Sequence, residues 1–173
     1  QFLLRFNEEI LLNRQKELHE RNIRIRFIGR QDRRVPRRLV RRIEEAAELT
    51  QGNTGLTFTI AFNYGGRAEL VDAVQRIVDS GVKRVSEKTI ARHLYDPEMP
   101  DPDLVIRTSG EYRVSNFLLW EMAYSELVFS ETLWPDFRRE HLYAAIKEYQ
   151  DRNRRYGGVG EAGGVDREGG ILG

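Results

Sequence analysis

The residues best suited to chemistry lie between Asp103 and Glu126. Leu104, Val105 and Ile106 form a short apolar run, which predicts a buried strand. A polar stretch with two arginines follows, and a serine then precedes an apolar block that can be helical. The sequence therefore predicts a strand, a polar loop and the start of a helix at Ser115.

This order of elements favours an anion site. Ligands of open parallel sheets bind at the carboxyl ends of the strands, and a helix N-terminus offers free N–H groups to an anion. Guanidinium groups bind phosphate oxygens in pairs, so Arg107, Arg113 and the capping Ser115 would suit a diphosphate. A structural arginine cluster beside an ordinary capped helix explains the same residues, and these features alone leave both interpretations open.

The periodicity of the chain predicts the elements that must position this stretch. Alternating or continuous apolar residues indicate strands at 23–28, around 56–62, at 104–106 and at 127–129. Helical spacing indicates helices at 2–20, from near Pro36, at 67–79, from Ser86 to near Tyr95 and at 138–155. Helical patterns between strands predict right-handed crossovers, so we expect an α/β fold with a central, mostly parallel β-sheet flanked by helices. The apolar face of the strand at 56–62 is expected to be core.

Two glycines at the end of the second strand, Gly65 and Gly66, allow close approach of the backbone to a ligand or to another loop. A glycine pair is a weak signal, and an ordinary tight turn fits it as well.

Composition limits the function classes. The 173 residues are enough for one domain with a core, and the net charge of +1 gives no global field that would favour nucleic acid or membrane. The chain contains no cysteine, which excludes disulfides, thiolate catalysis and thiolate metal ligands. No apolar run approaches the roughly 20 residues of a membrane span. Because the chain opens directly into helical periodicity, without methionine or a signal-peptide pattern, we expect it to be part of a longer protein.

The segment from Arg24 to Arg42 is strongly basic, because it contains nine arginines and only one acidic residue. Such a run can mark a nucleic-acid or lipid surface. However, Glu44, Glu45 and Glu48 follow at distances that suit ion pairs on a helix, and no aromatic residues are interleaved for base stacking. We therefore favour a solvated helix face and expect no nucleic-acid partner.

Several motifs resemble the cis-prenyltransferases, the undecaprenyl diphosphate synthase-like family. The resemblance runs in order along the chain to about Gly158. Its segments are Gly52-Asn53-Thr54-Gly55-Leu56, Asn63-Tyr64-Gly65-Gly66-Arg67, Pro102 to Glu111, Arg113, Ser115 to Trp120, Ala123 to Glu126, Leu133 to Phe137, and Arg154 to Gly158.

The resemblance implies a transferase that condenses isopentenyl diphosphate with an allylic diphosphate into a Z-polyprenyl diphosphate, the precursor of a cell-wall lipid carrier. It assigns Arg107, Arg113 and Ser115 to the diphosphate of isopentenyl diphosphate, and Glu126 to Mg²⁺. It further implies that Glu111 and Asn116 organise the loop. The helix at 2–20 would line a groove for the apolar product, and a share of the apolar face of the strand at 56–62 could face the same groove instead of the core.

One family motif is missing. The resemblance implies a His-x-x-Asp-Gly-Asn-x-Arg loop that binds magnesium and the allylic diphosphate, and His93 and Asp96 reproduce only its first spacing. We therefore expect residues 1–156 to be the C-terminal part of a single domain, with the catalytic residues upstream of residue 1 and little turnover by this chain alone. Residues 157–173, of which eight are glycine, are expected to form a flexible tail.

The resemblance also implies partners. Arg155 and Gly157 match a family motif that crosses a homodimer interface toward the other subunit's site, so we expect a homodimer. The expected location is the cytoplasm, with peripheral membrane contact for product release. A non-catalytic subunit supporting a catalytic relative is the alternative, although retention of the diphosphate-binding residues favours the enzyme.

Overall fold

The computed structural model describes residues 14–30 and 35–152. The first part of the helix expected at 2–20, the partner residues Arg155 and Gly157, and the tail at 157–173 all lie outside the described residues. The described chain falls into two compact units. One unit extends to Asp103 and includes Arg113–Ser125, and the other contains Leu104–Tyr112 and the chain from Glu126 onward.

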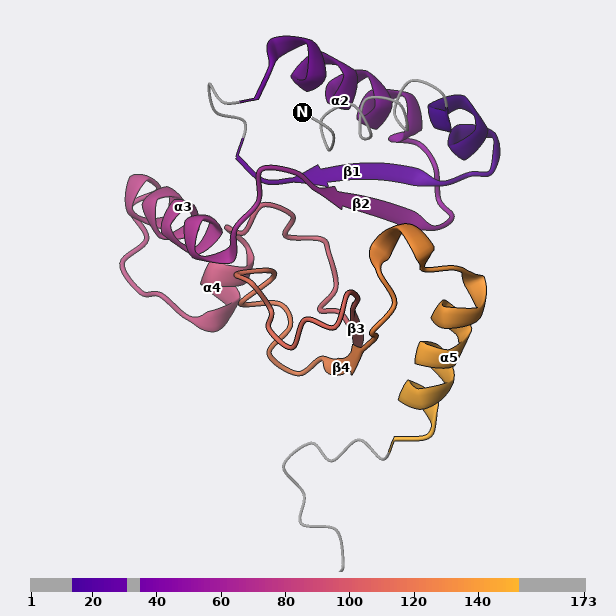
Figure 1. Cartoon of the computed structure of the whole chain (residues 1–173). Coiled ribbons are helices and arrows are strands. Elements are labelled where there is room, and N and C mark those ends of the chain that lie inside the picture. Colours follow the sequence, from indigo (N-terminus) through magenta and orange to yellow (C-terminus); the bar gives the residue numbers. More distant parts are fainter. Residues whose placement is uncertain (1–13, 31–34, 153–173) are drawn as a thin grey trace, which may run out of the picture. The chain divides into compact units, whose positions relative to one another are not determined.

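The first unit contains a parallel pair of strands, β1 (Arg24–Ile28) and β2 (Thr57–Ala61), with one face covered by α2 (Arg37–Thr50), as Figure 1 shows. The buried side chains that form the core at this contact are Ile25, Val35, Leu39, Ile43 and Ala46. Residues 14–20 are helical, so the described end of the first expected helix is confirmed. The strand at 23–28 and the helix from near Pro36 are also confirmed, because Pro36 is the N-cap of α2.

Thr50, the last residue of α2, ties this helix to the sheet. Its hydroxyl accepts a hydrogen bond from the Ile25 N–H at 2.9 Å and donates one to the Ala46 carbonyl at 2.9 Å. On the surface of α2, Arg41 and Arg42 pair with Glu45, as expected for a solvated helix face. Leu56 and Phe58 are 68% and 40% exposed. The prediction that the apolar face of the second strand is core is therefore wrong for these two residues, because α2 packs against β1 and leaves them uncovered.

The same unit continues through α3 (Gly66–Asp79) and α4 (Glu87–Ala91), which pack against each other. The helix expected at 67–79 is confirmed, and Gly81 follows it with a φ of +71° that only glycine adopts easily. Ser86 caps α4 by accepting a hydrogen bond from the Thr89 N–H. However, α4 ends at Ala91 and not near Tyr95, because the chain turns at Arg92.

The second unit contains a second parallel pair, β3 (Leu104–Arg107) and β4 (Glu126–Phe129), with the short 3₁₀ helix η1 (Trp134–Asp136) and α5 (Arg139–Gln150). Helix α5 packs on β3 and β4. Both strands confirm the predictions, and the α/β class with parallel strands and flanking helices is confirmed as well. No helix among the described residues is both long and apolar enough to cross a membrane.

The predicted helix start at Ser115 is wrong, because residues 115–124 form successive turns and bends. Ser115, Asn116 and Leu118 have φ angles of 49°, 63° and 41°. These positive values are incompatible with a right-handed helix. The helix N-terminus on which the anion site was partly argued is therefore absent from this loop.

Candidate functional site

Arg107 is the last residue of β3 and the first of the expected site residues. Its carbonyl accepts a hydrogen bond from the Ser130 N–H at 2.8 Å, so the end of β3 is fixed against the chain that leaves β4. The Arg107 Nε is buried and has no hydrogen-bond partner among the described residues. Leaving such a donor unpaired generally costs about 1–3 kcal/mol, and an oxygen of a bound anion would remove that cost.

The loop after β3 turns through Ser109 and Gly110, which have φ angles of 69° and 63°. Its N–H groups are held at 2.9 Å by the Thr132 carbonyl and at 3.0 Å by the Ser130 carbonyl. Tyr112, at its end, contacts the ring of Phe129 in a tilted arrangement, with ring centroids 5.0 Å apart. The loop at the carboxyl end of β3 is therefore built on the chain that follows β4.

Arg113 and Ser115 belong to the first unit, in the segment Arg113–Ser125, which we call the docked loop. Both residues are exposed. Asn116 fixes the loop to the start of α3: its carbonyl accepts from the Gly66 N–H at 2.7 Å, and its side-chain oxygen accepts from the Arg67 N–H at 2.9 Å. The helix N-terminus at α3 thus has its first donors satisfied by the docked loop. Asn116 organises the loop, as expected.

The glycine pair makes this close contact possible. A Cβ on Gly66 would lie 2.8 Å from the Leu119 Cγ and 3.0 Å from the Leu119 backbone nitrogen, and one on Gly65 would lie 2.7 Å from the Asn116 Nδ2. Of the two uses predicted for the pair, the structure shows the approach to another loop. Phe117 adds a T-shaped ring contact with Tyr64, at a centroid distance of 5.7 Å. Phe117 remains 40% exposed.

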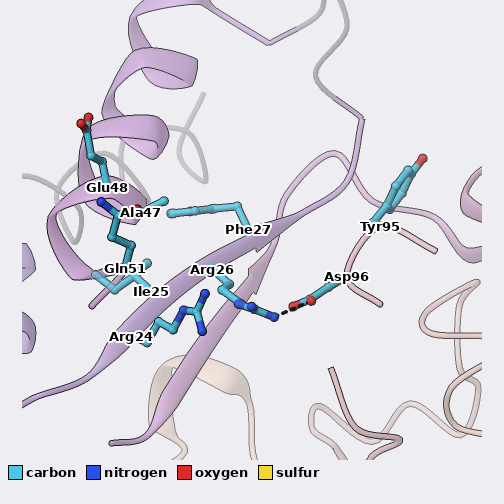
Figure 2. A pocket seen from close by; sticks show the side chains of 9 residues that line it. All are labelled: Arg24, Ile25, Arg26, Phe27, Ala47, Glu48, Gln51, Tyr95 and Asp96. Carbon is cyan, nitrogen blue, oxygen red and sulfur yellow. Dashed lines mark hydrogen bonds and ion pairs between the residues drawn. The ribbon is translucent and has the colours of Figure 1, made fainter. Parts of the chain in front are cut away.

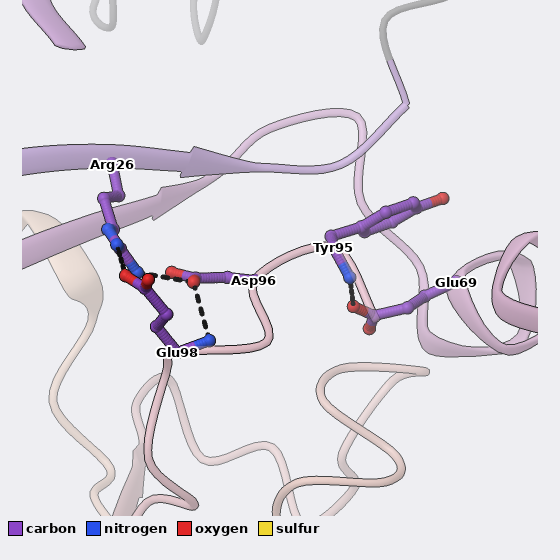
Figure 3. A network of polar contacts seen from close by, with 5 residues as sticks. All are labelled: Arg26, Glu69, Tyr95, Asp96 and Glu98. Atoms are coloured by element: carbon purple, nitrogen blue, oxygen red, sulfur yellow. Dashed lines mark hydrogen bonds and ion pairs between the residues drawn. The ribbon is translucent and has the colours of Figure 1, made fainter. Parts of the chain in front are cut away.

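A polar network fastens the Pro-rich connector that leads toward β3. Arg26 of β1 pairs with both Asp96 and Glu98 of the connector, and the Tyr95 N–H donates to Glu69 of α3 at 2.9 Å (Figure 3). The hydrogen bond to Glu98, followed by that to Asp96, raises the pKa of Arg26, against the opposing effect of burial. Asp96 therefore has a structural partner on β1, in keeping with its incomplete match to the aspartate motif.

A pocket of about 390 Å³ lies on the strand side of this network (Figure 2). Nine residues line it: Arg24, Ile25, Arg26, Phe27, Ala47, Glu48, Gln51, Tyr95 and Asp96. In Figure 2 the Arg26 guanidinium points toward Asp96 and is engaged by it. Because Asp96 and Glu98 already neutralise Arg26, this arginine is poorly suited to bind a diphosphate in the pocket.

Two acidic residues that the sequence did not single out are buried in the first unit. Glu69 on α3 is 2% exposed and Glu121 in the docked loop is 4% exposed. Burial above all, and then the charges of Glu69 and Asp101, raise the pKa of Glu121 to about 7. Glu69 is the fourth residue of α3. The helical spacing of this segment cannot reveal that Glu69 interacts with Glu121, which lies in the docked loop some fifty residues further along the chain.

Comparison with known proteins decides the family. The family model described as undecaprenyl diphosphate synthase matches residues 1–157. The chain belongs to this cis-prenyltransferase family.

Named relatives support the assignment. The chain is 49% identical over 164 residues to a trans,polycis-polyprenyl diphosphate synthase of Thermobifida fusca, which is specific for (2Z,6E)-farnesyl diphosphate. It is 45% identical over 160 residues to an isoprenyl transferase of Neisseria gonorrhoeae. These matches cover 91% and 92% of this chain but only 58% and 64% of the relatives.

Solved structures of the family share the fold. A lavandulyl diphosphate synthase from Lavandula x intermedia, solved with dimethylallyl diphosphate, has a TM-score of 0.85 and 36% identity, with 91% of this chain and 70% of that chain covered. A protein of Campylobacter jejuni described as a probable undecaprenyl diphosphate synthase has a TM-score of 0.82 and 30% identity, with 91% of this chain and 74% of that chain covered.

Glu126, the carboxylate that the family resemblance assigns to magnesium, is the first residue of β4. Its Oε2 accepts a hydrogen bond from the Arg152 Nη1 at 2.9 Å, and the same nitrogen donates to the Leu127 carbonyl at 2.9 Å. Among the described residues, no three acidic or histidine side chains gather closely enough to hold a metal. One carboxylate fits magnesium only where phosphate oxygens and water complete the shell.

Proposed function

We propose that this chain is part of an enzyme that condenses isopentenyl diphosphate with an allylic diphosphate to give a Z-polyprenyl diphosphate. The observation that carries the proposal is the identity of 45–49% to prenyl diphosphate synthases and isoprenyl transferases across about nine tenths of the chain. The lavandulyl diphosphate synthase, whose structure contains dimethylallyl diphosphate, supports an allylic diphosphate as one substrate.

The reaction sets clear physical demands. The C–O bond of the allylic diphosphate breaks, and its electron pair leaves with the diphosphate. The double bond of isopentenyl diphosphate forms the new C–C bond, and a proton is then lost. Two diphosphates must be held near each other despite their charge, and the charge that develops on the leaving group must be stabilised.

Arg107, Arg113 and Ser115 are proposed to hold the diphosphate of isopentenyl diphosphate. The unpaired Arg107 Nε supports this role, because a phosphate oxygen would supply the missing acceptor. Ser115 and Arg113 are both exposed residues of the docked loop. The positive φ of Ser115 also supports the role, since strained backbone is common at ligand sites.

Glu126 is proposed to hold Mg²⁺ together with diphosphate oxygens. Magnesium bound there would neutralise charge on the diphosphates. Arg152 fixes the orientation of the Glu126 carboxylate through their ion pair. For the ion to bind through Oε2, this pair must open or share the oxygen.

The proposal extends to the assembly. We propose a homodimer in which Arg155 or Gly157 reaches the other subunit's site, and a cytoplasmic enzyme that touches the membrane when the product leaves. The allylic half of the site is proposed to come from a His-x-x-Asp-Gly-Asn-x-Arg loop, a motif that the printed sequence does not contain.

The test is product formation by the protein expressed from its complete gene. Labelled isopentenyl diphosphate with an allylic primer and Mg²⁺ should give chain-extended products whose double bonds are Z. Conversion that is absent with both substrates and magnesium present, in a folded protein, would refute the proposal.

A further inference from the structure

Glu69 on α3 and Glu121 in the docked loop are two buried carboxyl groups, and the charge of Glu69 acts on Glu121. They are 2% and 4% exposed. Both oxygens of Glu69 already accept hydrogen bonds, one from the Tyr64 hydroxyl and one from the Tyr95 N–H at 2.9 Å (Figure 3). Each oxygen of Glu69 therefore has one fixed donor, and neither donor comes from the docked loop.

Glu121 is in the opposite situation. Its Oε2 is buried and has no hydrogen-bond partner among the described residues. The two neighbouring charges that raise the pKa of Glu121, those of Glu69 and Asp101, are both acidic. Tyr64 also interacts with both glutamates. Two buried carboxylates side by side repel, so one of them holds a proton. The proton belongs on Glu121, because its buried Oε2 has no donor among the described residues that would stabilise a negative charge.

The position of Glu121 links this proton to the proposed site. Glu121 stands in the docked loop, which is fixed to the start of α3 by Asn116 and carries Arg113 and Ser115. Ionisation of Glu121 would place a repulsion beside the two hydrogen bonds that join Asn116 to the start of α3. A charge on Glu121 next to Glu69 would push the loop away from the helix.

We propose that the Glu69–Glu121 carboxyl pair is a positioning device, in which one proton fastens the docked loop to α3 and so holds Arg113 and Ser115 in place. Loss of the proton loosens the loop. The identity of the ligand that Arg113 and Ser115 bind rests on the proposed function. The attachment of the docked loop to α3 by the protonated pair does not depend on that function. Glu69 and Glu121 touch no reacting atoms in this account and act only through the loop.

The direct test is hydrogen exchange of peptides from the docked loop, in the protein expressed from its complete gene. Because the pKa of Glu121 is about 7, protection should fall about tenfold between about pH 6 and about pH 8, after correction for intrinsic exchange. Glu121→Gln keeps the shape and hydrogen-bonding capacity of the protonated acid, so this variant should stay protected at both values. Glu44→Gln, on the exposed face of α2, should behave like the unmodified protein.

Two results would contradict the proposal. One is hydrogen-exchange protection of the docked loop that does not change with pH in the unmodified protein. The other is a pH response in Glu121→Gln that equals the response of the unmodified protein. If Glu121→Gln does not fold, Glu69→Gln provides a second comparison. Burial still raises the pKa of Glu121 in this variant, but the repulsion by Glu69 is gone, so the pH response of the loop should be weaker than in the unmodified protein. An undiminished pH response in Glu69→Gln would be decisive against the proposal.

A binding measurement tests the positioning step, with inorganic diphosphate as the probe. The affinity of the unmodified protein relative to Glu121→Gln should fall about tenfold from about pH 6 to about pH 8. Comparison at the same pH cancels the probe's own titration. A loop that loosens while this ratio stays constant would show that Glu121 does not position the diphosphate residues.

The outcomes are separable from those of the proposed function. Absence of product with both substrates would refute the prenyl transfer and leave the exchange experiment valid. Product formation without any pH response of the docked loop would refute the device and leave the proposed transfer intact.

Discussion

At the scale of single residues, the roles proposed for Arg107 and Arg113 give the most specific prediction. Each is proposed to donate charge-assisted hydrogen bonds to one diphosphate, and such bonds contribute about 1.5–3 kcal/mol. In the complete protein, Arg107→Ala or Arg113→Ala should therefore raise KM for isopentenyl diphosphate by about 10- to 100-fold. KM for the allylic primer should change far less.

Steady-state kinetics with each substrate varied in turn checks this prediction. Arg84→Ala is the matched control, because Arg84 is an exposed arginine in the turn between α3 and α4. Equal increases of KM for both substrates would show that these arginines do not distinguish the two diphosphates.

Glu126 carries the second prediction at this scale. Glu126→Gln keeps the shape and removes the charge, so it should lower kcat and weaken the dependence on Mg²⁺ while the fold is retained. A magnesium titration of activity measures both effects, with Glu140→Gln, on exposed α5 surface, as the control. An unchanged titration and kcat would leave Glu126 as only the partner of Arg152.

At the scale of elements, the contact between α3 and the docked loop depends on glycine at 66. A Cβ there would press on Leu119 at 2.8–3.0 Å, including its backbone nitrogen. Gly66→Ala should therefore displace the docked loop, with the cost of about 1–3 kcal/mol that is typical of overpacking. Denaturant unfolding measures the loss, and KM for isopentenyl diphosphate should rise because Arg113 and Ser115 move with the loop.

Gly52→Ala is the control for this substitution, because a Cβ at Gly52 meets nothing within 4 Å. It should leave both stability and KM nearly unchanged. Equal behaviour of the two alanine variants would mean that the loop yields to the added methyl group and that its position is not set by the glycine pair.

At the scale of the whole molecule, Glu121 makes stability depend on pH. Its pKa rises from the ordinary 4.5 to about 7 in the fold, so the folded state keeps a proton that the unfolded chain has released. The stability contribution is fully present below about pH 4.5 and is lost as the pH rises through about 7. The full difference is on the order of 3 kcal/mol.

Urea unfolding at a series of pH values checks this dependence, and Glu121→Gln should remove the part that belongs to Glu121. The free energies of unfolding of the two proteins should therefore diverge between about pH 4.5 and about pH 7 and run parallel above it. Parallel curves through this whole window would show that Glu121 ionises in the fold as it does in the unfolded chain.

The proposed homodimer belongs to the same scale. A specific interface of this kind should bury on the order of 1,200–2,000 Å² or more. Deleting the residues from Arg155 onward in the complete protein should abolish activity while circular dichroism and thermal unfolding report an intact fold. Unchanged kcat/KM together with a monomeric mass by light scattering would contradict both the dimer and the role of Arg155 and Gly157.

The sequence by itself determined the order of the elements and the family. Strand and helix periodicities are local properties, and the parallel strands, α2, α3 and the start of β3 appear where periodicity places them. The motifs from Pro102 to Glu126 identified the family without any structure, because a long ordered set of residue types is specific. The glycine pair was also readable, since only glycine tolerates close backbone approach.

Only the tertiary structure decided how the docked loop is held. The apolar block after Ser115 has helical composition, yet its backbone has positive φ angles that a helix cannot adopt. Asn116 in this block accepts hydrogen bonds from N–H groups at the start of α3, about fifty positions away in the sequence. The Glu69–Glu121 pair and the Glu126–Arg152 ion pair likewise join segments distant in sequence. Long-range contacts of this kind leave no periodic signal in the chain, because their partners are selected by packing in three dimensions and not by spacing along one element.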